Sequence, residues 1–599
     1  MKIVRLKVDN FRGIKSTELI FQGNTVLVGD NNSGKSTILE AIDLVLGPER
    51  LSKFPVIDEH DFYAGQYLGA TNDPIIINVE VVIIDLTVEQ QRHFRNHLEW
   101  WDQNSNSLID GPPPESTEKE KVISALRVGF SAYYDEEVDD FSAKTYFLSP
   151  TKDEGKFDSF NTKDKRKCGF LFLRTLRTGS RALSLEIGSL LDIIIKLQEL
   201  HVNMWEDILV QLRKIPVAEN PALGIVNILT TVQEAVRTFV PSDWADNPHI
   251  FVSDLTRTHL RRVLTVFMGT GAFNKDGAEY SAPFQHQGTG TINTLVLALI
   301  SFIAELKQNV IFAMEEPEIA IPPHAQKRII DNITLKSSQA LFTSHSPYVL
   351  EEFKPSQILV IKRESGVLSG VVAEYPPTIK PKKYRSEIRQ RFCESLLARR
   401  VLITEGRTEY DAFPAAARRL AELHPEEFQS LEAMGIAIVN AESETQVAPL
   451  GHFFRSLGKT VFAVFDKQSA TSKAEIEKEV DYPFEATEKG FENIILDETA
   501  EPALRRFVQF LIENDEWPSH LNSEKPSITT PLLELKLALE KYLGWSKGKG
   551  DAADLLMQCS KAEMPNFITE TLTSIQKFAI TKAIYVVEDL DEENPKESI

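Results

Sequence analysis

The first residues that could carry out chemistry form a glycine-rich phosphate-binding motif near the start of the chain. Residues 29–36 read Gly-Asp-Asn-Asn-Ser-Gly-Lys-Ser, between a short apolar stretch and a segment with a helical pattern. Backbone N–H groups of such a loop, and of the helix that follows it, bind phosphate oxygens. Lys35 is expected to neutralise β- and γ-phosphate charge, and Ser36 to bind Mg²⁺. The predicted nucleotide-binding residues here are Asn31, Asn32, Ser33, Gly34, Lys35, Ser36 and Thr37.

A second candidate lies at the end of a predicted strand in the middle of the chain. The apolar run Val310 to Met314 ends in two acids, Glu315 and Glu316. We expect Glu315 to contact Mg²⁺ directly or through water, and Glu316 to polarise the attacking water. Many strands end in an acidic turn, so this motif is informative mainly in combination with the first.

A third group of candidates lies in the carboxyl-terminal half, again where predicted strands end. The apolar stretch Val401 to Thr404 runs into Glu405 and Gly406, and a helical segment follows. A glutamate on a strand-to-helix turn can bind Mg²⁺ or act in acid–base chemistry, and glycine lets the backbone approach a metal closely. A second apolar stretch ends in Asp466 in the same way. The sequence therefore predicts a divalent-cation site in this region.

Alternating strand and helix patterns surround these motifs and predict an α/β fold. Apolar and charged residues alternate from the start of the chain, and residues 74–88 are rich in β-branched side chains. Between 182 and 268 apolar residues recur at helical spacing instead. We expect four segments: an N-terminal ATPase part (1–181), a helical insertion used for dimerisation (182–268), a C-terminal ATPase part (269–380) and a second α/β domain (381–599).

Composition disfavours several classes of protein. The net charge of −21 argues against a chain coated with nucleic-acid-binding surface, although a local basic groove is compatible with it. Only three cysteines occur, which excludes a disulfide scaffold and predicts a reducing, cytoplasmic location. The longest apolar stretch, Ile292 to Ala304, is too short to span a bilayer, and the first residues read as a strand rather than a signal peptide. The densest basic run, Lys380 to Arg400, fits either a solvated linker face or such a local groove.

The first two motifs lie far apart, and this spacing resembles the ATPase heads of the structural-maintenance-of-chromosomes and recombination-mediator families. Residues 10–13 (Asn-Phe-Arg-Gly) strengthen the resemblance. It places His345 where an ABC switch histidine senses the γ-phosphate. Gly288 and Gly290, before an apolar helix, are similar to a degenerate ABC signature, whose N–H groups cap the nucleotide of a partner subunit. Such heads close in pairs around ATP, so the resemblance implies a homodimer or a larger assembly.

An ABC head followed by the third group of motifs resembles the overcoming-lysogenization-defect (OLD) family of nucleases, which includes the nuclease subunit of Gabija-type defence systems. The resemblance covers nearly the whole chain and includes residues 396–406 at the domain junction. It implies that the second α/β domain is a TOPRIM domain. Lys547 would stabilise the transition state, with Lys549 as the alternative. The implied metal ligands are Glu405, Glu409, Asp466 and Glu492.

One motif departs from the family pattern. Its second acidic motif usually reads Asp-x-Asp, whereas the third residue here is Gln468. Glutamine can ligate Mg²⁺ through its carbonyl oxygen but brings no charge, so one metal position is weakened. The sequence leaves Glu485, Glu488 or Asp497 as alternative sources of a carboxylate.

Together the motifs and the resemblance favour hydrolysis of DNA phosphodiesters in the TOPRIM domain, regulated by ATP in the paired heads. The resemblance implies ATP and Mg²⁺ as cofactors, with Mn²⁺ or Ca²⁺ as alternatives at the TOPRIM site, and a role in bacterial or phage defence. It also implies that a helicase or a retron-type reverse transcriptase encoded nearby is a candidate partner. The alternative is a non-cleaving, ATP-driven DNA sensor or clamp with a degenerate TOPRIM domain. A primase or topoisomerase is disfavoured, since zinc-ribbon cysteines and a strand-passage domain are not visible.

Overall fold

The chain forms two compact units in the computed structural model. Unit 1 comprises residues 1–5, 39–58 and 79–343, and unit 2 comprises residues 6–38, 59–78 and 344–599. Three elements, β1 (Lys2–Phe11), α1 (Lys35–Leu46) and β4 (Ile77–Ile84), have residues in both. The structure describes all residues except 49, 53–54, 110, 112–120, 150–156, 174–183, 187–188, 199–200, 214–224, 239–255, 289–291, 293–294, 297, 300–301, 304, 306–309, 321, 375–388, 528 and 593–599.

Unit 1 is a mixed α/β body with two runs of paired strands. In one run β7 pairs antiparallel with β5 and β8; in the other β12 lies between β9 and β13 and is parallel to both. Every residue of β12 is buried, as expected for a strand covered on both faces. The other elements of the unit are α2 (Val88–His93), β5 (Leu98–Asp102), β6 (Ser107–Ile109), β7 (Val122–Asp135), β8 (Asp140–Phe147), α3 (Thr162–Cys168), β9 (Phe170–Leu173), β12 (Ile311–Glu315), α10 (Pro323–Lys336) and β13 (Gln339–Thr343).

The segment expected to be a helical insertion contains α5 (Leu190–Leu197), α6 (His201–Arg213), α7 (Ile225–Arg237) and α8 (Arg257–Val263). A hairpin of β10 (Phe267–Phe273) and β11 (Glu279–Pro283) follows. Trp205 of α6 and Leu260 of α8 belong to a small buried cluster, beside which Arg261 contacts Asp192 at 3.0 Å. The use of this segment for dimerisation stays a prediction.

Unit 2 contains the remaining head strands. Within it, β14 pairs parallel with β3 and antiparallel with β15, which in turn pairs with β2. The four residues of β3 are fully buried, and the glycine-rich loop follows directly, as predicted. The elements of this part are β2 (Ile14–Ile20), β3 (Thr25–Val28), α11 (Pro347–Leu350), β14 (Ile358–Glu364) and β15 (Val367–Val372).

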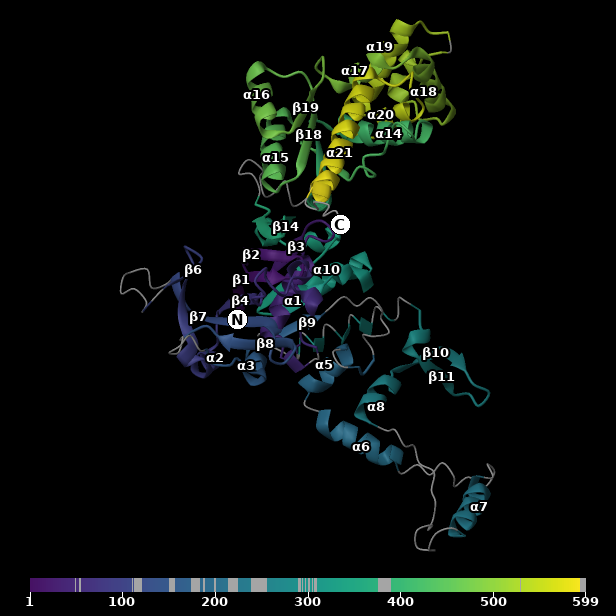
Figure 1. The fold of residues 1–599 in the computed structure, drawn as a ribbon. Coiled ribbons are helices and arrows are strands. Elements are labelled where there is room, and N and C mark those ends of the chain that lie inside the picture. Colours follow the sequence, from purple (N-terminus) through teal and green to yellow (C-terminus); the bar gives the residue numbers. More distant parts are fainter. Residues whose placement is uncertain are drawn as a thin grey trace, which may run out of the picture. The chain divides into compact units, whose positions relative to one another are not determined.

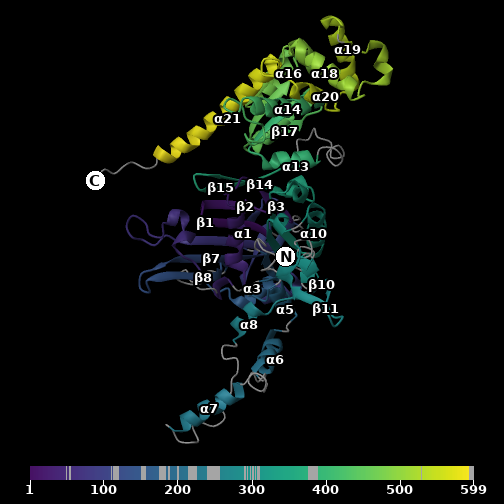
Figure 2. The ribbon, with the colours of Figure 1, turned by 90° about the vertical axis from the view of Figure 1, so that its right-hand side faces the viewer.

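The carboxyl-terminal part of unit 2 is built on a four-stranded parallel sheet in the order β17-β16-β18-β19. Helices α15 and α16 lie on one side of these strands, and α14 and α21 on the other (Figure 1). In the turned view of Figure 2, α21 runs as one long helix. The elements of this carboxyl-terminal part are α13 (Arg389–Leu397), β16 (Arg400–Thr404), α14 (Arg407–Leu423), β17 (Ile436–Asn440), α15 (Glu444–Ser456), β18 (Thr460–Phe465), α16 (Ala470–Glu479), β19 (Tyr482–Glu485), α17 (Phe491–Glu498), α18 (Glu501–Glu513), α19 (Leu532–Trp545), α20 (Asp551–Met557) and α21 (Asn566–Glu592).

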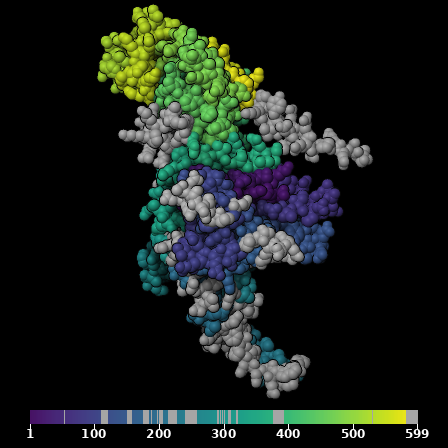
Figure 3. All heavy atoms as spheres, turned by 90° about the vertical axis from the view of Figure 1, so that its left-hand side faces the viewer, coloured from purple at the N-terminus to yellow at the C-terminus, as the bar shows by residue number. Residues whose placement is uncertain are grey.

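A large apolar core supports this sheet and holds its carboxyl edge in place. Phe462 and Val464 of β18 pack into the same buried cluster as Phe413 of α14 and Phe491 of α17. In the space-filling view of Figure 3 the side chains of this part, green to yellow, form a continuous surface. The predicted α/β fold class is confirmed. Among the described helices, none is long and apolar enough to cross a membrane.

Candidate active site

Two acids lie side by side because of the topology of the four-stranded sheet. β16 and β18 are parallel neighbours, with Thr404 opposite Val464. Glu405 and Asp466 are the first residues after these strands, so both leave the sheet at its carboxyl edge. β17 lies on the other side of β16, so the strand order reverses between β16 and β18. In open α/β sheets, ligands bind outside the carboxyl ends of strands at such a point.

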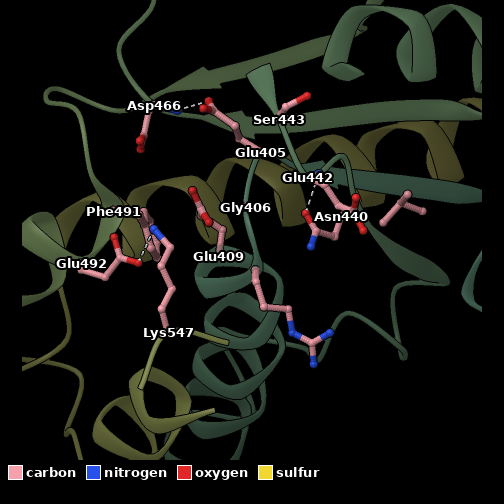
Figure 4. A pocket seen from close by; sticks show the side chains of 12 residues that line it. Glu405, Gly406, Glu409, Asn440, Glu442, Ser443, Asp466, Phe491, Glu492 and Lys547 are labelled. Carbon is pink, nitrogen blue, oxygen red and sulfur yellow. Dashed lines mark hydrogen bonds and ion pairs between the residues drawn. The ribbon is translucent and has the colours of Figure 1, made fainter. Parts of the chain in front are cut away.

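A cavity of about 710 Å³ lies at this edge of the sheet (Figure 4). Glu409 enters it from the first turn of α14 and Glu492 from the first turn of α17, where helix dipoles favour negative charge. Figure 4 shows the four carboxylates and the ammonium of Lys547 around a common space. The lining residues are Glu405, Gly406, Arg407, Glu409, Val439, Asn440, Glu442, Ser443, Asp466, Phe491, Glu492 and Lys547.

Glu405 and Asp466 are each held through one carboxylate oxygen. Oε2 of Glu405 accepts hydrogen bonds from the backbone N–H of Asp466 at 3.0 Å and from Nε2 of Gln468 at 2.9 Å. Oδ2 of Asp466 accepts one from the backbone N–H of Gly490 at 2.9 Å. Oδ1 of Asp466 is buried and has no hydrogen-bond partner among the described residues. A buried carboxylate oxygen without a donor is suited to a cation, because leaving it unsatisfied costs free energy.

Glu492 is held by two donors on a single oxygen. Thr408 donates its hydroxyl to Oε1 at 2.7 Å, and Nζ of Lys547 lies 2.9 Å from the same atom. Burial raises the pKa of Glu492, but the hydrogen bonds from Thr408 and Lys547 outweigh it, and the net pKa is lowered. Hydrogen bonding to Glu492 raises the pKa of Lys547. Both groups are therefore charged at neutral pH.

Glu409 is the most deeply buried acid of the cavity, at 4 % exposure. Burial, together with the charges of Asp466, Glu492 and Glu405, raises its pKa to about 7. Gly406 makes room for this carboxylate, since a Cβ atom there would lie 2.7 Å from Oε2 of Glu409. Glu409 is thus placed to exchange a proton near neutral pH.

The charged forms of Glu405 and Asp466 are also disfavoured by their surroundings. Burial is the largest cause that raises the pKa of Glu405 and that of Asp466, and neighbouring carboxylates raise both further. In the described part of the chain, however, no three Asp, Glu, His or Cys groups lie close enough together to hold a metal ion. The four carboxylates share one cavity, but Glu405, Asp466 and Glu492 are each held by separate hydrogen-bond donors rather than gathered at one point.

The structure separates the two candidate lysines. Lys547 lines the cavity, whereas Nζ of Lys549 lies 3.4 Å from the centre of the Trp545 ring. Of the alternative acids, none lines the cavity. Glu485 accepts hydrogen bonds from the backbone of Gln468 and from Lys473, and Asp497 contacts Lys536.

Sequence reasoning missed four residues of the cavity at or just after the end of β17, namely Val439, Asn440, Glu442 and Ser443. Asn440 ends this strand, and its side chain accepts a hydrogen bond at 2.8 Å from the backbone N–H of Glu442. Ser443 comes next, before α15. The signal was present, because residues 436–440 form an apolar stretch that ends in polar residues, as the two recognised motifs do.

The glycine-rich loop has the local geometry of a phosphate-binding loop. Lys35 is buried and donates to the carbonyl oxygens of Gly29 at 3.0 Å and Asp30 at 2.8 Å. Gly29 has φ of 150°, and a Cβ atom there would lie 2.4 Å from the carbonyl oxygen of Ile361. Only glycine fits this position, because the loop lies against the backbone of β14.

His345 lies near this loop, within unit 2. It lines a cavity of about 1120 Å³ together with Gly29, Asp30 and Asn31. The preceding residue, Ser344, donates its backbone N–H to the carbonyl oxygen of Leu27 in β3 at 3.3 Å. Of the two signature glycines, Gly288 is exposed and Gly290 lies outside the described residues.

The paired acids of the second motif belong to unit 1. Glu315 is the last residue of β12 and is 7 % exposed. Glu316 has φ of 43° and donates its backbone N–H to the carbonyl oxygen of Thr343 at 2.9 Å. A non-glycine residue in this conformation is strained, and such strain is concentrated at functional sites.

Two known domain families match these regions. The AAA ATPase domain family matches residues 1–174 and 192–350, which is more than half of the chain. The overcoming lysogenization defect protein-like TOPRIM domain matches residues 396–467, which contain Glu405 and Asp466. The chain therefore belongs to the AAA ATPase domain family and carries an OLD-like TOPRIM domain. Domains of these two kinds generally use ATP and divalent metal ions.

Individual relatives cover different parts of the chain. The Old nuclease of Escherichia phage P2 is 24% identical over 458 residues, which is 71% of this chain and 71% of that protein. The DNA double-strand break repair Rad50 ATPase of Methanopyrus kandleri is 47% identical over 53 residues, 9% of this chain and 6% of that protein. A solved SmcHead bound to the C-winged helix domain of ScpA aligns with 62% of this chain and 98% of its own, at 14% identity and a TM-score of 0.33.

Proposed function

We propose that this protein is an ATP-binding, divalent-metal-dependent DNA endonuclease that hydrolyses phosphodiester bonds in its TOPRIM domain. The observation that carries the proposal is the convergence of Glu405 and Asp466 at one sheet edge, in a cavity shared with Glu409, Glu492 and Lys547. The match to an OLD-like TOPRIM domain and the similarity to a phage nuclease support it.

The residues of the cavity divide the chemistry between them. Divalent cations, with Mg²⁺ as the first choice and Mn²⁺ or Ca²⁺ as alternatives, would position a phosphate and polarise water. Glu405 and Asp466 supply the carboxylate oxygens for cation binding. Lys547 neutralises charge that develops on the phosphate oxygens, as fixed cations do in phosphoryl transfer. Glu409, with a pKa of about 7, holds or releases a proton at its carboxylate.

ATP binds in the head through the glycine-rich loop. Lys35 and Ser36 would bind the phosphates and Mg²⁺, and Glu315 would serve as a further Mg²⁺ ligand. Glu316 would orient the attacking water, and His345 would sense the γ-phosphate.

The chain acts as a homodimer or a larger assembly, with the segment Gly288 to Gly290 of one head capping ATP on the other. Its setting is bacterial or phage defence in the cytoplasm, where a helicase or a reverse transcriptase encoded nearby is a candidate partner. The similarity to the phage P2 nuclease supports the nuclease part of this setting.

Plasmid cleavage tests the proposal. Supercoiled DNA is incubated with the full chain and Mg²⁺, Mn²⁺ or Ca²⁺, with and without ATP. We expect nicked or linear product with at least one metal, and its loss in Asp466→Asn. Asp497→Asn is the matched control, because Asp497 is exposed and contacts Lys536 away from the cavity. Absence of cleavage under all conditions would contradict the proposal.

A second candidate function is a non-cleaving, ATP-driven DNA sensor or clamp. The observation that favours it is that Gln468 and backbone N–H groups already bond to Glu405 and Asp466, and among the described residues no three Asp, Glu, His or Cys groups lie close enough for a metal ion. Under this alternative the chain binds DNA in an ATP-dependent manner, and Asp466→Asn changes neither binding nor the integrity of the DNA.

A further inference from the structure

Gln468 makes two contacts that fix it between the cavity and β19. Its side-chain Nε2 donates to Oε2 of Glu405 at 2.9 Å, and its backbone N–H donates to Oε1 of Glu485 at 3.0 Å. Glu485 is held in turn by Lys473, whose Nζ lies 2.6 Å from Oε2. The amide of Gln468 therefore reaches Glu405 from an anchored backbone.

The contact with Gln468 determines which oxygen of Glu405 remains open to a ligand. Oε2 accepts two hydrogen bonds, from Gln468 and from the backbone of Asp466, and a carboxylate oxygen has about two lone pairs to offer. Among the described residues no donor reaches Oε1. Asp466 is arranged in the same way, with Oδ2 bonded to Gly490 and Oδ1 buried without a partner. Each acid thus keeps one oxygen for a cation.

Charge argues for a single cation at this pair of acids. On the side of Glu405 that Gln468 occupies, a second cation would need another negatively charged ligand, but Gln468 is neutral and Glu485 is paired with Lys473. A positive charge is already present on the other side of the cavity, where Nζ of Lys547 lies 2.9 Å from Oε1 of Glu492. Hard divalent cations select charged oxygen ligands, so an amide is a weak substitute.

We propose that Gln468 is a positioning residue that holds Glu405 with one oxygen open and restricts the site to one divalent cation, with Lys547 as the fixed second positive charge. This inference rests on the proposed function, since it concerns the same cavity. The new claim is that Gln468 sets the number of cations in the cavity, whereas the proposed function is that the chain cleaves DNA.

Mn²⁺ binding tests the inference without a cleavage assay. Titrations use the full chain without nucleotide, in a Lys35→Ala background that disables the head, and are read by calorimetry and by electron paramagnetic resonance. We expect one tight Mn²⁺ per chain, with the spectrum of an isolated ion. Gln468→Ala should weaken this binding about tenfold, the usual effect of removing a hydrogen-bond partner of a metal ligand.

The isosteric variant Gln468→Glu gives the sharper result. It replaces the donor by a carboxylate of the same reach, so it should admit a second Mn²⁺ and produce a spin-coupled spectrum. Gln509→Ala and Gln509→Glu are the matched controls, because Gln509 makes the same kind of bond, to Glu513 at 2.8 Å, on the exposed surface of α18. Both controls should bind one Mn²⁺ with unchanged affinity.

The possible outcomes separate the inference from the proposed function. Two spin-coupled Mn²⁺ ions in the Lys35→Ala parent, or unchanged binding in Gln468→Ala, would overturn the inference even if DNA is cut. One Mn²⁺ that responds to Gln468 as expected, without DNA cleavage, would support the inference and contradict the proposed function. Absence of tight Mn²⁺ binding would overturn the inference, whereas the proposed function is decided by the cleavage assay with all three metals.

Discussion

Nζ of Lys547 lies 2.9 Å from Oε1 of Glu492, and the hydroxyl of Thr408 donates to the same oxygen at 2.7 Å. The ion pair joins the loop before α20 to the first turn of α17, two segments that are distant in sequence. It keeps the ammonium at the cavity that Glu405 and Asp466 also line.

Lys547→Met should lower the cleavage rate by at least about 100-fold, the typical cost of removing one group that stabilises transition-state charge. Mn²⁺ binding at Glu405 and Asp466 should change much less, since Lys547 does not contact either acid. Lys549→Met is the control, because Lys549 lies over Trp545, and it should retain a rate within a few-fold of the parent. Equal losses in the two variants, measured by single-turnover cleavage, would contradict this role.

The raised pKa of Glu409 should make the folding stability of the chain depend on pH. Its pKa is raised from the ordinary 4.5 to about 7, chiefly by burial, so in this window the folded chain holds a proton that the unfolded chain has released. Stability therefore falls as pH rises from 4.5 to 7. Without divalent metal, the charged form at pH 8 costs at most about 3 kcal/mol.

Glu409→Gln removes this cost and should raise the melting temperature at pH 8, with little change near pH 4.5. Differential scanning calorimetry at the two pH values measures it. Glu570→Gln, on an exposed part of α21, is the control and should have no effect at either pH. A melting temperature for Glu409→Gln at or below that of the parent at pH 8 would argue against a buried, charged Glu409.

Gly406→Ala should disturb the site without unfolding the domain. The added Cβ atom would lie 2.7 Å from Oε2 of Glu409, so the carboxylate has to move. We expect Mn²⁺ affinity and cleavage to fall about tenfold, as for other changes next to metal ligands, with a nearly constant melting temperature. Gly544→Ala is the control, since a Cβ atom there would meet nothing within 4 Å. Unchanged affinity would show that Glu409 does not have to occupy this position.

Two variants of the ATPase head should separate ATP binding from ATP hydrolysis. Lys35→Ala should abolish detectable ATP binding, because Lys35 is the cation of the phosphate-binding loop. Glu316→Gln should preserve binding and slow hydrolysis by about 100-fold or more, as for loss of a general base. Equilibrium binding of a fluorescent ATP analogue and phosphate release measure the two steps. Rapid hydrolysis by Glu316→Gln would remove that residue from the proposed role.

Site residues that lie directly after a strand could be predicted from the sequence alone. Glu405 and Asp466 could be recognised because each follows an apolar strand, and parallel strands bring such residues to one edge. Asn440 and Glu442 obey the same rule and were missed, since no motif drew attention to their strand. The spacing of helices and strands likewise predicted the α/β class.

Contacts between side chains from separate segments could not be predicted. Nothing in the order of residues indicates that Gln468 bonds to Glu405, or that Lys473 engages Glu485, because these contacts depend on how β18, α16 and β19 pack. The raised pKa of Glu409 depends on burial by distant segments in the same way. These contacts decide which acids remain open to a cation.

Anomalous diffraction from crystals of the full chain grown with Mn²⁺ tests whether Glu405 and Asp466 bind a cation together. We expect a Mn²⁺ peak in the cavity, bound by Oε1 of Glu405 and Oδ1 of Asp466. The peak should disappear in Asp466→Asn. A fully occupied Mn²⁺ site elsewhere in the domain, with this edge of the sheet empty at saturating Mn²⁺, would contradict it.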